Sequence, residues 1–306
     1  AKRDFTINED ESCLSLFARY RQRHKVIKAL WEPLCLAGLN THINTASAEV
    51  FLRMLRETFA HTRQDSELLL TQIDLGKLFP DPAIDFIERM GGSVKLGQRV
   101  EAIQIVQDKV AGVSLSDRSI KAQHIILATP CYTTAKLCSE HPQLQSLSQG
   151  LQQIGSNPIC TVYLQYDAQT SMEEDMVGSI GTTSQWIFDR KIYGQRGLMA
   201  VVISGNGEHM NLSNDKLAQL AANEIADEFP HWPAPQQHMV IREKRATFDC
   251  CVGINKVRPG NTTAIQQLWL AGDYTDTGLP ATLESAVRSG IRSARGVMKS
   301  IRRSSL

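Results

Sequence analysis

The stretch LWLAGDYTDTGLPATLESAVRSG, residues 268–290, decides the fold that this sequence predicts. Residues 267–271 form a short apolar run that is typical of a buried strand, and Gly272 and Asp273 follow it at once. A turn-rich loop then leads into residues 281–301, which predict a long helix. Apolar residues recur along this helix at Leu283, Val287, Ile291, Ala294, Met298 and Ile301.

A strand that ends in Gly-Asp just before a helix suits an anionic cofactor. The first turn of a helix presents unpaired N–H groups and about half a positive charge, which stabilise phosphates or the electron-rich edge of an isoalloxazine ring. Gly272 would let backbone approach such a ligand closely, and Asp273 offers an acceptor to a sugar hydroxyl. A buried strand before a capped helix is also common without a ligand, so both interpretations stay open.

The rest of the chain predicts a helical beginning followed by alternating strands and helices. We expect helices at 12–30, ended by Trp31-Glu32-Pro33, at 47–59 with Ser47 as N-cap, at 82–90 and at 213–229, with helix and loop at 131–155. We expect strands at 93–96, 99–106, 110–115, 124–128, 159–166, 185–189, 198–204 and 239–245. The continuous apolar run 124–128 is typical of a strand buried on both faces.

Composition excludes several classes of protein. The 306 residues suffice for about two domains, and the net charge of +1 does not favour a nucleic-acid partner. Seven cysteines without regular spacing argue against a disulfide scaffold, and no apolar run reaches the length of a membrane span. No signal peptide is apparent and the chain does not begin with Met, so we expect a cytoplasmic chain with reduced thiols that was shortened upstream.

The stretch 268–290 resembles the C-terminal flavin motif of the amine oxidase and phytoene desaturase superfamily. Residues 275–284, TDTGLPATLE, are more specific and resemble the squalene-associated FAD-dependent branch, the hydroxysqualene dehydroxylases. Several other stretches resemble the same branch. They are REKRATF at 242–248, LWEPL at 30–34 with LNT at 39–41, and LLL at 68–70 with DL at 74–75 and LFP at 78–80. Ser285 departs from the pattern, because a glycine is expected there.

The resemblance implies FAD as cofactor and a role for particular positions. Asp273, after Gly272, would contact the ribityl–pyrophosphate part, and the backbone at Thr282 and Leu283 would face the flavin pyrimidine edge. The backbone of Val100 would meet the adenine, and the strand end at Ala128, Thr129 and Pro130 would pass near the pyrophosphate. Judged without the resemblance, Val100 is simply a buried strand residue.

One part of the family pattern is missing. The family opens with a βαβ unit carrying G-x-G-x-x-G, whose helix N-terminus binds the pyrophosphate. Neither Gly91-Gly92 nor Gly178 with Gly181 fits that motif. We therefore expect that a unit of at least ~30 residues is absent, lost from the chain or supplied by a separate one, and that this chain alone binds FAD poorly.

Other candidate residues have two interpretations each. The basic stripe of the last helix would contact anionic lipid or would be a solvated face; it comprises Arg288, Arg292, Arg295, Lys299 and Arg302, with Arg303 beside it. Asp276 would act as an acid near the flavin or would serve turn chemistry. His42 would line a substrate cavity or would be satisfied by backbone. No histidine pair has helical metal-binding spacing and no G-x-S-x-G elbow occurs, so we expect neither a metal site nor a hydrolase.

The predicted fold class is α/β (α+β), with a partial glutathione-reductase-like FAD domain and a mixed-sheet, helical substrate domain. Residues 79–150 and 251–306 would form the FAD domain, and residues 1–78 and 151–250 the substrate domain. The resemblance implies an oxidoreductase that converts hydroxysqualene, a lipophilic isoprenoid, to squalene. The alternatives are a carotenoid-type desaturase, an amine oxidase, or a remnant that is inactive without its βαβ unit.

Overall fold

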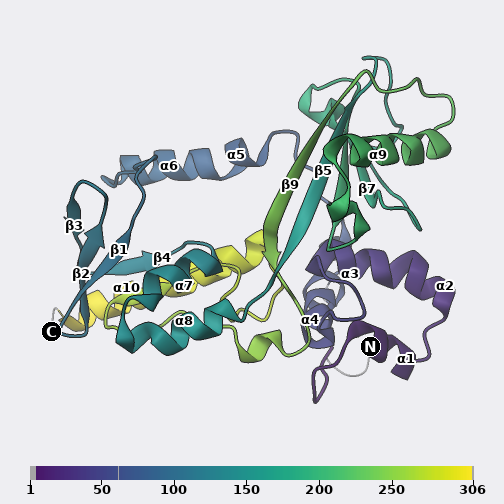
Figure 1. The fold of residues 1–306 in the computed structure, drawn as a ribbon. Helices are drawn as coiled ribbons and strands as arrows, with labels where there is room; N and C mark the ends of the chain where they lie inside the picture. Colours follow the sequence, from purple (N-terminus) through teal and green to yellow (C-terminus); the bar gives the residue numbers. More distant parts are fainter. Residues whose placement is uncertain (1–4, 61, 305–306) are drawn as a thin grey trace.

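The computed structural model describes residues 5–60 and 62–304, which form helices and three sheets (Figure 1). The N-terminal helices are α1 (Cys13–Arg19), α2 (His24–Val26), a π-helical turn (Ile27–Trp31), α3 (Glu32–Leu39) and α4 (Ala48–Phe59). The prediction of one helix over 12–30 was wrong, because the chain turns at Arg21, which has a φ of 52°. Nor does the helical region end at Pro33, since proline is tolerated in the first turn of α3. Ser47 caps α4 as predicted.

Residues 62–99 form an arm that contains no buried residue. Its elements are a 3₁₀ turn (Arg63–Ser66), α5 (Leu75–Leu78) and α6 (Pro80–Arg89). In Figure 1, α5 and α6 are drawn apart from the other helices. The strand predicted at 93–96 does not form, because these residues pair with no strand of the described chain.

Two small sheets follow the arm. Three antiparallel strands, β1 (Ala102–Val106), β2 (Lys109–Ser114) and β3 (Ser119–Lys121), precede β4 (Ile125–Leu127), α7 (Cys131–Ser139), a 3₁₀ turn (Pro142–Leu144) and α8 (Gln145–Gln152). β4 pairs in parallel with β10 (Leu268–Leu270), with Ile126 opposite Trp269. The predicted burial of β4 on both faces was wrong: Ile125 and Leu127 enter the core, whereas Ile126 is 39% exposed.

The large sheet is antiparallel and has the strand order β6-β7-β8-β5-β9. Its strands are β5 (Ser156–Gln165), β6 (Met176–Gly178), β7 (Trp186–Asp189), β8 (Leu198–Ser204) and β9 (Gln237–Phe248). Helix α9 (Asn214–Glu228), capped by Ser213 as predicted, packs Leu217, Ala221 and Ile225 against this sheet. β9 is longer than predicted and carries the chain away from α9 and back toward α10 (Figure 1).

Helix α10 (Leu283–Ser304) presents an unexpected face to the protein. Its buried residues are small: Ser285, Ser289 and Ser293 are all 0% exposed, and Gly296 packs against the ring of Trp269. The predicted apolar stripe is largely exposed, with five members between 42% and 73%: Leu283, Val287, Ile291, Met298 and Ile301. A surface helix normally buries such a stripe. Among the described residues, no helix is both long and apolar enough to cross a bilayer.

Candidate functional site

The candidate site is a cavity of about 540 Å³ at the ends of β4 and β10. The carboxyl ends of parallel strands lie at the same end of a sheet. Residues 128–132, after β4, and residues 272–274, after β10, therefore meet there. Residues 154–156 and the end of β9 at 245–248 also line it, and Ala286 in the first turn of α10 completes the lining. Pieces of chain from several distant parts of the sequence therefore share one cavity.

Tyr274 ties the two strand ends together. Its side chain is 1% exposed, and its hydroxyl lies 3.0 Å from Oγ1 of Thr134, which in turn lies 2.8 Å from Oγ1 of Thr129. The ring lies against Gly272, where a Cβ atom would come within 2.5 Å of it. Gly272 has a φ of 153°, so glycine is required there both by the packing of Tyr274 and by the backbone.

Asp273 brings a carboxyl group to the cavity lining. Burial raises the pKa of this carboxyl, while the N–H groups of Tyr274 and Asp273 and the nearby Arg258 oppose the rise. A partly buried carboxylate with spare lone pairs is suited to accept hydrogen bonds from hydroxyl groups of a ligand.

Arg258 holds the loop between Asp273 and α10, and no spacing in the sequence pointed to it. The guanidinium is 5% exposed and donates hydrogen bonds to backbone carbonyls along the loop, at 3.0 Å to Asp273 and 2.8 Å to Leu279. It also donates to the carbonyls of Tyr274 and Thr275. Its planar fork has five N–H donors on three nitrogens and reaches carbonyls spread along the loop, whereas an ammonium group has three donors on a single nitrogen. Burial lowers the pKa of Arg258, yet the group keeps its charge.

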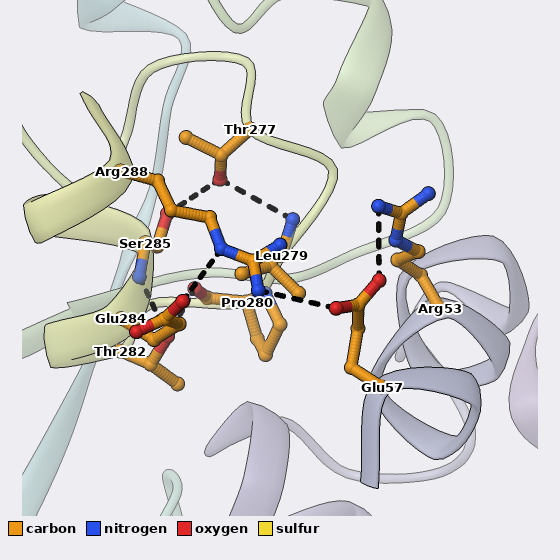
Figure 2. Close-up of polar contacts among 9 residues, drawn as sticks. All are labelled: Arg53, Glu57, Thr277, Leu279, Pro280, Thr282, Glu284, Ser285 and Arg288. Carbon is orange, nitrogen blue, oxygen red and sulfur yellow. Dashed lines mark hydrogen bonds and ion pairs between the residues drawn. The ribbon is translucent and has the colours of Figure 1, made fainter. Parts of the chain in front are cut away.

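The start of α10 is built from hydroxyl groups (Figure 2). Thr282 acts as the cap, because its Oγ1 accepts from the N–H of Ser285 at 3.2 Å. Ser285, which stands where the family pattern has glycine, is buried and bonds to Oγ1 of Thr277 at 2.6 Å and to the carbonyl of Asp273 at 3.0 Å. Serine therefore fits this position, since its hydroxyl group joins the helix to the loop. Further along, Oγ of Ser289 accepts from the N–H of Gly272 at 3.0 Å.

An ion-pair chain fixes α10 to α4. Arg288 donates to Glu284 at 2.6 Å and to Glu57 at 3.1 Å, and Glu57 pairs with Arg53 at 3.0 Å (Figure 2). Arg292 donates to the carbonyl of Asp276 at 2.8 Å. Two members of the predicted basic stripe therefore serve contacts within the protein. The contact of the stripe with anionic lipid stays a prediction.

The structure brings together five of the eight predicted cofactor residues. The cavity is lined by Ala128, Thr129, Pro130, Gly272 and Asp273. Thr282 and Leu283 lie at the start of α10, shortly before the cavity residue Ala286, and Leu283 is 73% exposed. Val100 precedes β1, outside the cavity lining; the strand predicted from residue 99 begins at Ala102.

The other candidates lie away from this cavity. The side chain of Asp276 is exposed and does not belong to the cavity lining. Nε2 of His42 lies 2.6 Å from the carbonyl of Asn206, although His42 also lines a different cavity. Within the described ranges no group of three or more metal-ligating side chains occurs, and all seven cysteines are free.

The cavity suits the polar part of a flavin cofactor. Asp273 can accept from ribityl hydroxyls, and the N–H groups in the first turn of α10 can donate to an electron-rich ring edge. Tyr132, which the sequence did not single out, and Arg245, from the quoted stretch 242–248, also line the cavity, with the guanidinium 4.5 Å from the ring centroid. No glycine-rich strand–helix turn that could cradle a pyrophosphate occurs in residues 5–60 and 62–304.

Comparisons with known proteins agree with this geometry. The model of the family described as flavin containing amine oxidoreductase matches residues 3–298. The hydroxysqualene dehydroxylase of Sinorhizobium fredii is 28% identical over 276 residues, which cover 87% of this chain and 61% of that protein. The 15-cis-phytoene desaturase of an Oncidium hybrid cultivar is 24% identical and is covered to 40%, with 71% of this chain aligned.

A solved structure of an oxidoreductase from Methanosarcina mazei superposes with a TM-score of 0.72 at 14% identity, covering 94% of this chain and 69% of that one. The two chains therefore share a fold. The chain spans about 61% of the length of the dehydroxylases it matches. Since the family model covers nearly all of the described residues, the chain belongs to the flavin-containing amine oxidoreductase family, and FAD is its expected cofactor.

Proposed function

We propose that this chain forms part of an FAD-dependent oxidoreductase that removes the hydroxyl group of hydroxysqualene and yields squalene. The observation that carries the proposal is the cavity that joins Asp273, the start of α10 and the end of β9, because the stretches 242–248 and 275–284 resemble the dehydroxylases. The relatives from Sinorhizobium fredii and Zymomonas mobilis, both named hydroxysqualene dehydroxylase, support the choice of substrate.

An apolar cavity supports a lipophilic substrate. It has a volume of about 610 Å³ and lies between α1 and α4, lined mainly by aromatic and aliphatic side chains: Phe5, Leu16, Phe17, Tyr20, Trp31, Phe51, Leu52 and Leu55. Two of its rings, Phe17 and Trp31, are stacked at 5.7 Å between centroids. A long hydrocarbon gains free energy in such a lining, because its apolar surface leaves water.

The chain's own residues would orient the cofactor and exclude water. When bound and reduced, the flavin would supply a hydride, which forms the new C–H bond, and a proton from the solvent would let the oxygen of the broken C–O bond leave as water. Asp273 would hold the ribityl chain, and Arg258 would keep the carbonyls of the loop turned away from the cavity. The dipole of α10 would stabilise negative charge at the edge of the ring.

The test offers hydroxysqualene to the reduced, FAD-loaded protein and identifies the product by mass spectrometry. We expect squalene. Protein that leaves hydroxysqualene unchanged when its FAD is reduced, but desaturates phytoene when its FAD is oxidised, would instead support a carotenoid-type desaturase, as the Oncidium relative suggests. Oxidation of a primary amine would support an amine oxidase. The flavin content is measured beforehand by absorbance, so that a lack of cofactor is not mistaken for a wrong substrate.

A further inference from the structure

Asn40 joins four segments of the chain beside the candidate site. It ends α3 in the left-handed backbone region, with a φ of 50°, which asparagine adopts more readily than most residues. Its side chain is buried and contacts the start of β5, the residue after β8 and the end of β9. A buried amide group needs partners for its oxygen and for both of its N–H hydrogens, and Asn40 finds them in these three segments.

The contacts of Asn40 fix which way its amide group points. Oδ1 accepts from the N–H of Gly205 at 2.6 Å. Nδ2 donates to the carbonyl of Pro158 at 3.2 Å and to Oγ1 of Thr247 at 2.9 Å, and the carbonyl of Asn157 lies 3.4 Å from it. Because a backbone N–H only donates and a carbonyl only accepts, an exchange of Oδ1 and Nδ2 would break these bonds. Asn40 is therefore the donor in its hydrogen bond with Thr247.

The hydroxyl group of Thr247 is thereby left with a hydrogen to donate. A threonine hydroxyl has one hydrogen and two lone pairs, and Asn40 occupies one of the lone pairs. Within residues 5–60 and 62–304 this hydroxyl group makes no second hydrogen bond. Thr247 is half-buried and lines the cavity at the ends of β4 and β10. It therefore offers a hydrogen-bond donor to a ligand in that cavity.

Other hydroxyl groups of the cavity lining lack this arrangement. Those of Tyr274 and Thr129 both bond to the hydroxyl group of Thr134, at 3.0 and 2.8 Å. Ser156 is exposed, and no side chain or backbone group of the described chain bonds to its Oγ. The hydroxyl group of Ser156 can therefore rotate freely, whereas that of Thr247 is oriented by a buried amide group.

We propose that Thr247 donates this hydrogen to an acceptor atom of the flavin ring and that Asn40 is the positioning residue that directs it. The ring system offers carbonyl oxygens and unprotonated nitrogens as acceptors. Thr247 shares the cavity with Ala286, in the first turn of α10, whose N–H groups would face the same ring. A donor that is oriented before the ligand arrives loses little conformational freedom on binding. The proposal rests on FAD as the cofactor and does not depend on the substrate.

Titration of the purified chain with FAD up to millimolar concentrations, followed by difference absorbance of the flavin bands, tests this donor. Thr247→Val keeps the shape of the side chain but removes the hydroxyl group. It should weaken FAD binding about 3- to 10-fold and shift the flavin band, because one hydrogen bond to the ring is lost. Thr247→Ser restores the hydroxyl group and should behave like the wild type. The matched control is Ser156→Ala, in the same cavity, which should change the affinity less than about 2-fold.

Asn40→Asp tests the direction of the hydrogen bond. Its carboxylate would still accept from the N–H of Gly205, but it would also accept from Thr247, so the hydroxyl hydrogen would turn away from the cavity. This variant should weaken FAD binding about as much as Thr247→Val, and the double variant should bind no more weakly than either. A merely structural role of Asn40 would add its effect to that of Thr247→Val. Thermal unfolding checks that each variant folds, and Thr247→Val with Thr247→Ser decides the question if Asn40→Asp does not.

Three results of the FAD titration would overturn the proposal. They are an unchanged affinity and flavin band in folded Thr247→Val, an equal loss of affinity in Ser156→Ala, and a wild-type chain whose flavin band does not change at millimolar FAD. An unchanged titration of Thr247→Val together with a raised KM for hydroxysqualene would assign the donor to the substrate, which also overturns it. Titrations that come out as expected in a chain that leaves hydroxysqualene unchanged would count against the proposed function alone.

Discussion

Replacement of Arg258 tests how the loop before α10 is held. The guanidinium donates to four backbone carbonyls of the loop and to the side chains of Asn255 and Thr277, and it lies 4.8 Å from the ring centroid of Phe248. A buried acceptor that loses its donor costs about 1–3 kcal/mol. Water that enters the space left by the side chain would recover part of this, so we expect Arg258→Ala to lose about 3–5 kcal/mol of unfolding free energy.

The assay combines thermal unfolding with flavin binding. Arg258→Ala should lower Tm by roughly 6–15 °C. Arg258→Lys should lie between wild type and alanine, because an ammonium has three donors and cannot span the loop. At temperatures where the lysine variant is still folded, it should bind FAD more weakly, since the carbonyls that position Asp273 and α10 are no longer fixed.

Arg292→Lys is the matched control. Arg292 also donates to a carbonyl of this loop, that of Asp276, but it does so at the exposed surface. We expect a loss below about 1 kcal/mol for this variant. If Arg258→Lys and Arg292→Lys unfold at the same temperature and bind FAD equally, the assignment of Arg258 as the residue that organises the loop is refuted.

Further substitutions probe the same region. Asp273→Asn should weaken FAD binding while leaving the ligand-free chain equally or more stable at neutral pH. Burial raises the pKa of this carboxyl in the folded chain above its ordinary 3.8, so the free energy of unfolding falls as the pH rises from the unfolded pKa through the folded one. The Asn variant should lose this pH dependence in urea unfolding. An unchanged pH profile would contradict the burial of the charge. Gly290→Ala and Gly296→Ala form a pair within α10: alanine at 290 meets no atom within 4 Å and should stabilise by about 0.5–1 kcal/mol, whereas at 296 its Cβ would meet the Trp269 ring at 2.3 Å and should destabilise by about 1–3 kcal/mol. Equal melting temperatures for the two would refute the packing described for α10.

Local patterns in the sequence identified most of the elements. Ser47 and Ser213 cap the helices they were predicted to cap, and strands were predicted where β5, β7, β8 and β9 of the large sheet lie. The resemblance implied that Gly272, Asp273, Ala128 and Thr129 lie near one cofactor, and these four residues line one cavity; their contact with FAD stays a prediction. These features depend on short-range chemistry, which a sequence displays directly.

Features set by tertiary contacts could not be predicted. The orientation of α10 depends on two hydrogen bonds, one between the hydroxyl groups of Ser285 and Thr277 and one from the N–H of Gly272 to Oγ of Ser289. The periodicity of the apolar residues alone predicted that a different face of this helix is buried. Arg258 carries no local signal, because these carbonyl partners lie 15 to 21 residues away. The exposure of Ile126 shows that the described chain covers its face of β4 only in part, which the composition of β4 does not reveal.

Hydrogen exchange with and without millimolar FAD tests the central claim, that the ends of β4 and β10 and the first turn of α10 hold the flavin. Even weak binding should slow exchange at residues 128–132, 272–274 and 282–286, with no comparable change in α9. Protection confined to other parts of the chain, under conditions where a flavin signal reports binding, would contradict this account of the site.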